Sequence, residues 1–309
     1  MLLWLLACTP PASTPVDEIV DDYDPNAPIR ERCFGEIGED AVLPDYEDMG
    51  AVVPRHCMGT DHQDIDAVGR VVFLGDSITA GTPPTPAEGI YRALVTAGLQ
   101  ERFGSVSTDN CAEYGASVDD LLGPGGQFER CFTEPIDEPT LVVFTIGGND
   151  MVDRGRELAN GVPVEQVDAT AAASLGLLEQ AIRWLEDQDG VLFRGGVDVI
   201  FSNVYEYTDQ TNDIGSCPMA EFFEVPEIDA LPERYAALNE SYVDLAVRTQ
   251  TDIVLLFESF CGHGFHNEDP ESPCYRGPGT PRWFDDTCIH PTPAGHAQLA
   301  EMVLAIVDE

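Results

Sequence analysis

Short apolar runs alternate with helix-like segments along most of this chain, and no other feature constrains the fold as strongly. Each run is continuously apolar, which is typical of strands buried on both faces. The runs lie at 70–76, 140–150, 196–204 and 251–259, and the helix-like segments at 87–102, 165–188, 232–250 and 292–308. Strands alternating with helices predict an α/β fold in which helices cover both faces of a parallel sheet.

The charged residues are strongly unbalanced. The 309-residue chain carries 15 arginines, no lysine and 56 acidic residues, which gives a net charge of −41. Such a surface repels phosphate backbones and anionic membranes, so we expect no nucleic-acid partner. Hydrophobic residues make up 43% of the chain, enough for one large domain with a substantial core.

The N-terminal segment is typical of the end of an export signal. A short apolar stretch leads to Leu5-Leu6-Ala7-Cys8, which resembles a bacterial lipobox. We expect residues 1–8 to direct export and Cys8 to carry a lipid as the membrane anchor; a disordered apolar N-terminus is the alternative. Residues 9–30, rich in proline and acid, predict a tether, residues 31–66 a disulfide-held strap, and residues 67–309 the main domain.

The other eight cysteines form an even set, which fits four disulfides in an oxidising compartment. Proximity in sequence favours the pairs Cys33–Cys57, Cys111–Cys131, Cys217–Cys261 and Cys274–Cys288. Cys261, His263 and His266 also have a spacing that could bind zinc. Because an oxidising compartment favours a disulfide at Cys261, we expect no metal.

Polar residues follow the first two predicted strands. Gly75-Asp76-Ser77 ends the first, and Asn149 follows the second. The carboxyl ends of parallel strands share one edge of the sheet, where the sites of such folds lie. Helix capping explains Ser77 equally well, and a tight turn explains Asn149.

Further along, Gly115 and His290 complete a set suited to acyl transfer. A serine becomes nucleophilic beside a base, and histidine suits that role because its pKa is near neutrality. The backbone N–H groups of Ser77 and Gly115 and the Asn149 amide could bind an oxyanion. Taken singly, Gly115 is an ordinary turn glycine and His290 a structural histidine.

Four motifs occur in a familiar order: GDSIT, N-x-A-x-x-G-x-S, GGND and D…IHPTPAGH. Over residues 70–309 the chain therefore resembles the SGNH hydrolases, also called GDSL esterases and lipases. The resemblance implies a three-layer α/β/α flavodoxin-like fold with a central parallel sheet. It also implies Ser77 as nucleophile, Gly115 and Asn149 in the oxyanion hole and His290 as base.

The acidic partner of the histidine departs from that pattern. The family's acid usually lies three residues before the histidine, and this chain has Thr287 there. We expect Asp286 to orient His290; Asp285 and a main-chain carbonyl remain alternatives.

These features predict a secreted serine esterase that acts through an acyl-enzyme and needs no cofactor. An acyltransferase acting on a sugar or lipid alcohol is the alternative, and a non-catalytic surface-binding module is a weaker one. The insertions at 205–232 and 260–285 are expected to shape the substrate pockets. Neither has a long apolar lid pattern, which favours short acyl groups or sugar esters.

Overall fold

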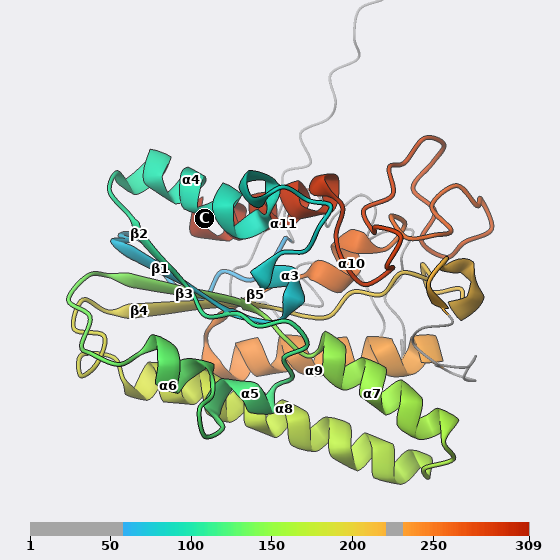
Figure 1. The fold of residues 1–309 in the computed structure, drawn as a ribbon, viewed down its shortest axis with the longest axis horizontal. Coiled ribbons are helices and arrows are strands. Elements are labelled where there is room, and N and C mark those ends of the chain that lie inside the picture. The colour runs from blue at the N-terminus through green and yellow to red at the C-terminus, as the bar shows by residue number, and fades with distance from the viewer. Residues whose placement is uncertain (1–57, 221–230, 309) are drawn as a thin grey trace, which may run out of the picture.

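A five-stranded, wholly parallel sheet forms the centre of the molecule (Figure 1). The computed structural model describes residues 58–220 and 231–308. The strands lie in the order β2-β1-β3-β4-β5. Their bounds are β1 Arg70–Gly75, β2 Ser107–Asn110, β3 Thr140–Thr145, β4 Val197–Ser202 and β5 Asp252–Val254. The predicted α/β class and parallel sheet are confirmed.

Side chains on successive positions of the central strands enter two separate cores. In β1, Val72 and Leu74 pack into one core, whereas Val71 and Phe73 pack into the other. These four side chains are at most 1% exposed. Because both faces of the sheet are covered, the strands are continuously apolar, as the sequence pattern required.

Helices form the two outer layers. In Figure 1, α4 (Tyr91–Phe103) and α11 (Pro293–Asp308) lie on one face of the sheet, with α8 (Val164–Asp187) and α9 (Leu231–Thr249) on the other. The other helical segments are α3 Ser77–Ala80, η1 Ala87–Gly89, α5 Asp119–Leu122, α6 Gln127–Cys131, α7 Gly148–Ala159, η2 Ile214–Ser216 and α10 Leu256–Phe260. The result is the predicted three-layer α/β/α arrangement.

Several local features differ from the sequence prediction, among them the edge strand β2, which was not expected. The apolar run at 251–259 forms only the short strand β5 and then turns into α10. Asn203 explains the change, because its side-chain oxygen accepts the N–H of Phe257 at 2.8 Å in the first turn of α10. Another difference is α7, which begins at Gly148, where the sequence offered a tight turn as the alternative to a functional Asn149.

The segment before β1 packs along β5. Gly59 forms an antiparallel bridge with Val254, and the Thr60 hydroxyl donates to Asp252 Oδ1 at 3.0 Å. Cys8, the tether at 9–30, Cys33 and Cys57 lie outside the described residues. Within residues 58–220 and 231–308, no helix has the length and apolar character needed to cross a membrane.

Candidate active site

Ser77 lies at a sharp turn between β1 and α3. Gly75 makes the turn, with a φ of +109°, and a Cβ there would lie 2.0 Å from the Thr145 carbonyl oxygen. Asp76 caps α3, because its Oδ1 accepts the Ile78 N–H at 3.0 Å. Since Asp76 is the cap, the Ser77 hydroxyl is available to another partner.

That partner is His290, in the loop before α11. His290 Nε2 lies 2.9 Å from Ser77 Oγ, although 213 residues separate the two in sequence. The loop is held in place because the Asp285 N–H donates to the His290 carbonyl at 2.9 Å and the Tyr205 hydroxyl donates to the Ile289 carbonyl at 2.8 Å. The structure thus brings together the serine and histidine that the sequence singled out.

Asp286 does not contact the imidazole. Its carboxylate pairs with Arg282 at 2.9 Å, and its side chain is 79% exposed. The expectation that Asp286 orients His290 is therefore wrong. The turn at Cys288 (φ +69°) directs Asp286 outward and places the Thr287 hydroxyl 2.9 Å from His290 Nδ1.

Asp285, which the sequence left as an alternative, lies behind Thr287. Its side chain is buried, and its Oδ1 accepts the Thr287 hydroxyl at 2.5 Å and the Thr287 N–H at 2.8 Å. The carboxylate therefore reaches the imidazole through an intervening hydroxyl.

Burial governs the ionisation of the site. It lowers the pKa of the His290 imidazole, and the nearby Asp285 carboxylate opposes that shift. Burial also raises the pKa of Asp76 to about 7, against the hydrogen bonds from Thr145 and Ile78. A neutral imidazole can accept a proton, so His290 is in the form that a general base requires at neutral pH.

The predicted oxyanion donors come from three parts of the chain: Ser77 from α3, Asn149 from α7 and Gly115 from the loop between β2 and α5. Ser77 is the first residue of α3, where backbone N–H groups have no partner within the helix. Asn149 lies in the first turn of α7, and its Nδ2 donates one hydrogen bond to the Ala116 carbonyl at 2.8 Å. An amide Nδ2 carries two protons, so one is left for a ligand.

Gly115 is linked to Asn149 through the next residue, Ala116. It is exposed, has a φ of +76°, and directly precedes the Ala116 carbonyl that Asn149 holds. Ser77 and Asn149 line one cavity, and Gly115 is not among the described residues of its wall.

This cavity has a volume of about 130 Å³ and opens beside Ser77. Most of its wall is apolar, and its residues come from the ends of β1, β3 and β4 and from α7 and α9. Apolar side chains in the wall include Ile78, Ile146, Met151, Val204, Ile214 and Leu231. Among the described wall residues, the charged ones are Asp76 and Glu206, both acidic. The cavity therefore favours an uncharged, largely apolar group next to the serine.

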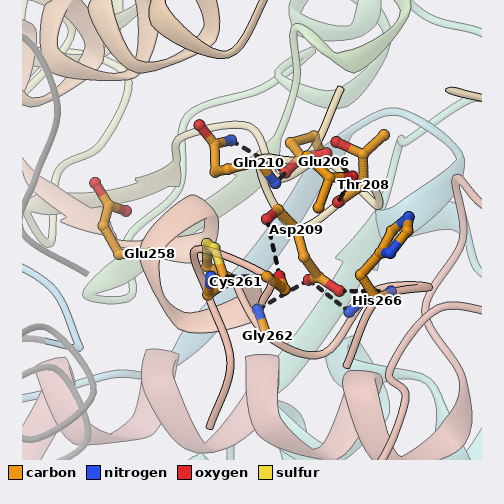
Figure 2. Close-up of a disulfide and its surroundings, with 12 residues drawn as sticks. Glu206, Thr208, Asp209, Gln210, Glu258, Cys261, Gly262 and His266 are labelled. Carbon is orange, nitrogen blue, oxygen red and sulfur yellow. Dashed lines mark hydrogen bonds between the residues drawn. A yellow bond between two sulfur atoms is a disulfide. The ribbon is translucent and has the colours of Figure 1, made fainter. Parts of the chain in front are cut away.

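Buried Asp209 joins the two insertions at the rim (Figure 2). Its Oδ1 accepts the N–H groups of Gly262 and Gly264 at 2.8 Å, and its Oδ2 accepts that of His266 at 2.9 Å. These contacts fix the segment around Asp209, next to the cavity residues Thr208 and Gln210, to the insertion at 260–285. The insertion at 205–232 contributes residues to the cavity wall, whereas the described wall residues include none from 260–285, which contacts the first insertion through Asp209.

The disulfides agree with the sequence expectation in part. Cys111–Cys131 is confirmed. The other predicted pairs within the described residues are wrong, since the structure has Cys217–Cys288 and Cys261–Cys274 instead of Cys217–Cys261 and Cys274–Cys288. Proximity in sequence misled the prediction because the fold brings the η2 loop against the loop that carries His290. Cys217 thereby pairs with Cys288, which lies 71 residues further along the chain.

The suggested zinc ligands have other partners. Cys261 is in a disulfide, the His263 ring stacks on Trp283, and His266 lies 3.2 Å from Asp213. In the part of the chain that the structure describes, no group of three or more His, Cys, Asp or Glu side chains is arranged to hold a metal.

Sequence reasoning missed Gln127 and the part played by Thr287. Gln127 is fully buried and bonds to the backbone of Gly75 from 52 residues away. Nothing in the local sequence around Gln127 signals that contact. Thr287 did carry a signal, because it occupies the position at which the resemblance led us to expect an acid.

Comparison with known proteins gives one match to a family model. The GDSL-like Lipase/Acylhydrolase family matches residues 73–298, a span that includes Ser77, Asn149 and His290. A search of curated proteins gave no match.

Solved structures resemble this fold at low sequence identity. One is a member of the lipolytic protein G-D-S-L family from Veillonella parvula, with a TM-score of 0.50 and 15% identity over 78% of this chain and 98% of that one. Another is a candidate GDSL-like lipase from Parabacteroides merdae, with a TM-score of 0.54 and 15% identity over 80% of this chain and 99% of that one. At these identities the likeness concerns the fold alone.

Proposed function

Because the chain belongs to the GDSL-like lipase/acylhydrolase family and is a hydrolase of that class, we propose that it is a serine esterase that forms an acyl-enzyme on Ser77. The observation that carries the proposal is the 2.9 Å distance between Ser77 Oγ and His290 Nε2. A serine and a neutral imidazole in hydrogen-bond contact, beside an apolar cavity, suit acyl transfer.

The reaction has two steps. His290 Nε2 takes the Ser77 proton while Oγ attacks the ester carbonyl, and the protonated imidazole then gives that proton to the leaving alcohol. Water attacks the acyl-enzyme in the second step, with His290 again as base. The N–H groups of Ser77 and Gly115 and the Asn149 amide stabilise the oxyanion in each step.

The cavity supports a small, uncharged acyl group. Its volume of about 130 Å³ is well below the roughly 300–1,000 Å³ of pockets that enclose drug-sized ligands. Its wall is largely apolar, and its described charged residues are Asp76 and Glu206. We therefore keep short acyl esters, including acylated sugars, as the favoured substrates.

We also propose that the protein is exported and held to a membrane by a lipid on Cys8. The disulfides Cys111–Cys131, Cys217–Cys288 and Cys261–Cys274 support export, because such bonds persist in oxidising compartments. Fractionation of cells that express the full chain tests the anchor. Wild type should be in the membrane fraction and Cys8→Ser in the soluble fraction; soluble wild type would contradict it.

A chain-length series of p-nitrophenyl esters, run alongside acetylated polysaccharides, tests the activity. We expect the highest kcat/KM for short acyl groups and no turnover by Ser77→Ala, which removes one hydroxyl and leaves the fold unchanged. Ser77→Ala activity within about tenfold of wild type would end the proposal. An added alcohol acceptor distinguishes the alternative, because an acyltransferase would form the new ester faster than the free acid.

A further inference from the structure

A single hydroxyl, that of Thr287, lies between the imidazole of His290 and the Asp285 carboxylate. Thr287 Oγ1 is 2.9 Å from His290 Nδ1 and 2.5 Å from Asp285 Oδ1. The same Asp285 oxygen accepts the Thr287 backbone N–H at 2.8 Å, so the threonine is held at both its backbone and its side chain.

The number of protons fixes the direction of these hydrogen bonds. An ionised carboxylate only accepts, so the Thr287 hydroxyl donates its one proton to Asp285. The hydroxyl oxygen can then only accept from His290, which requires the proton of the neutral imidazole to be on Nδ1. The lone pair of Nε2 therefore faces Ser77, in the tautomer that can act as a base.

We propose that Thr287 and Asp285 form a hydroxyl-bridged positioning pair that holds His290 in its productive tautomer and stabilises the imidazolium. The inference rests on the proposed esterase function and adds two positioning residues to it. When His290 Nε2 takes the Ser77 proton, the Nδ1 proton stays on the ring and the Thr287 proton stays on its hydroxyl. The new positive charge is then balanced through the hydroxyl by the buried Asp285 carboxylate.

A purely structural role is the competing explanation. Asp285 bonds to the Thr287 backbone N–H, and the Asp285 N–H bonds to the His290 carbonyl, so the pair also shapes the turn. The Thr287 hydroxyl separates the two explanations, because Thr287→Val removes it and leaves the backbone contacts in place. Thr287→Ser is the matched variant that keeps the hydroxyl.

Kinetics on one short-chain ester test the proposal. We expect Thr287→Val and Asp285→Asn each to lower kcat by about 10²–10⁴-fold with little change in KM, since loss of an orienting carboxylate costs about 10⁴ in a serine protease. The double variant should be no worse than the poorer single variant, because the two groups act as one unit. Thr287→Ser should stay within a few-fold of wild type, and so should the exposed control Asp286→Asn.

The pH profile supplies a readout that a structural role would not move. Among the described residues, the titratable groups near His290 include Asp285 on its own loop, His296 in α11, Tyr205, whose hydroxyl bonds to the Ile289 carbonyl, and Asp76, the neighbour of Ser77. Asp285 raises the pKa of His290, so its loss lowers that pKa. The acid limb of kcat/KM should therefore move to lower pH in Asp285→Asn and remain in place in Asp286→Asn.

The outcomes are distinguishable. An inactive Ser77→Ala together with a Thr287→Val that keeps near-wild-type kcat would overturn the positioning pair and leave the esterase intact. Multiplicative losses in the double variant, or an acid limb unmoved in Asp285→Asn, would also overturn it. An active Ser77→Ala would overturn the esterase itself. Circular dichroism and thermal unfolding of each variant show whether it is folded. If Asp285→Asn does not fold, the kcat of Thr287→Val alone tests the positioning pair.

Discussion

One side-chain amide, that of Gln127 in α6, pairs with both backbone polar groups of Gly75. Gln127 Oε1 accepts the Gly75 N–H at 2.6 Å, and Gln127 Nε2 donates to the Gly75 carbonyl at 2.8 Å. Gly75 is the residue that turns the chain into Ser77, so a distant helix holds the turn that presents the proposed nucleophile.

Replacing Gln127 should therefore destabilise the fold and the site together. Gln127→Leu leaves the buried Gly75 N–H unpaired, at about 1–3 kcal/mol, whereas the Gly75 carbonyl still accepts the Glu113 N–H at 2.9 Å. We expect urea denaturation to show a loss of about 1–3 kcal/mol in the free energy of unfolding. Gln180→Leu is the matched control, because Gln180 is exposed on α8 and should change stability by no more than about 0.5 kcal/mol. Equal effects of the two substitutions would contradict the assignment.

Asn149→Ala should lower kcat by about 10²–10³-fold, as the loss of one oxyanion donor does elsewhere. KM should change much less, because the donor acts on charge that develops during the reaction. Asn160→Ala is the control, since Asn160 ends the same helix with an exposed side chain whose Nδ2 bonds to Arg156. A kcat for Asn149→Ala within a few-fold of the control would remove Asn149 from the oxyanion hole.

The two disulfides near the site should differ in their effect on activity. Cys217–Cys288 closes 71 residues and ends two positions before His290, whereas Cys261–Cys274 closes 13. The chain-entropy model gives stabilisations of about 4 and about 3 kcal/mol, respectively. We expect Cys217→Ser/Cys288→Ser to lose far more kcat than Cys261→Ser/Cys274→Ser at temperatures where both are folded. Matching kcat values would show that the first bond does not position the histidine.

Glu258 should make the fold less stable as the pH rises. Burial raises its pKa to about 7, against the hydrogen bond from Asn203, and its side chain is only 4% exposed. The folded state therefore binds this proton more tightly than the unfolded state does. Its stabilising effect is complete below the unfolded pKa of 4.5 and is lost as the pH rises through about 7.

Glu258→Gln tests this sign, because glutamine resembles the protonated acid. The variant should unfold at a higher temperature than wild type at pH 8, and the difference should shrink at pH 5. Glu301→Gln, at an exposed position on α11, should show no such dependence on pH. A difference in Tm that is independent of pH would argue against a raised pKa for Glu258.

The acidic wall of the cavity should select against anionic acyl groups. Glu206 and Asp76 are its described acidic residues, and Asp76, with a pKa raised to about 7, is only partly ionised at neutral pH, so a succinyl ester brings a further negative charge chiefly beside Glu206. We expect kcat/KM for a monosuccinyl ester to be on the order of tenfold or more below that of the butyryl ester of the same alcohol. Glu206→Gln should narrow the gap, and equal rates for both esters in wild type would show that the acyl group does not enter this cavity.

Local sequence was sufficient for the strands that lie inside the sheet. Burial on both faces of β1, β3 and β4 demands continuous apolar runs, and such runs are visible without any knowledge of the fold. The edge strand β2 escaped notice because its residues, Ser107–Asn110, are polar and mostly exposed. It pairs on one side only, with β1, so nothing in its composition separates it from a loop.

The sequence predicted those residues of the site that lie in recognisable motifs. Ser77 and His290 each follow a recognisable pattern, and the fold brings them together. The orienting group depended on the turn geometry around Cys288, whose φ of +69° sends Asp286 outward and Thr287 inward. That turn is tied to Cys217, and no local pattern encodes a contact across 71 residues.

The segment that packs along β5 also bears on how copies of this chain meet. An unpaired strand edge is a template on which a second chain can add, and this is a common start of aggregation. Here the Thr60 N–H donates to the Ile253 carbonyl at 3.1 Å, and the Leu255 N–H donates to the Met58 carbonyl at 2.9 Å, so the outer rim of β5 is already occupied. A chain that lacks residues 1–63 would lose both contacts and expose the outer edge of β5. We therefore expect such a truncated chain to self-associate through that edge.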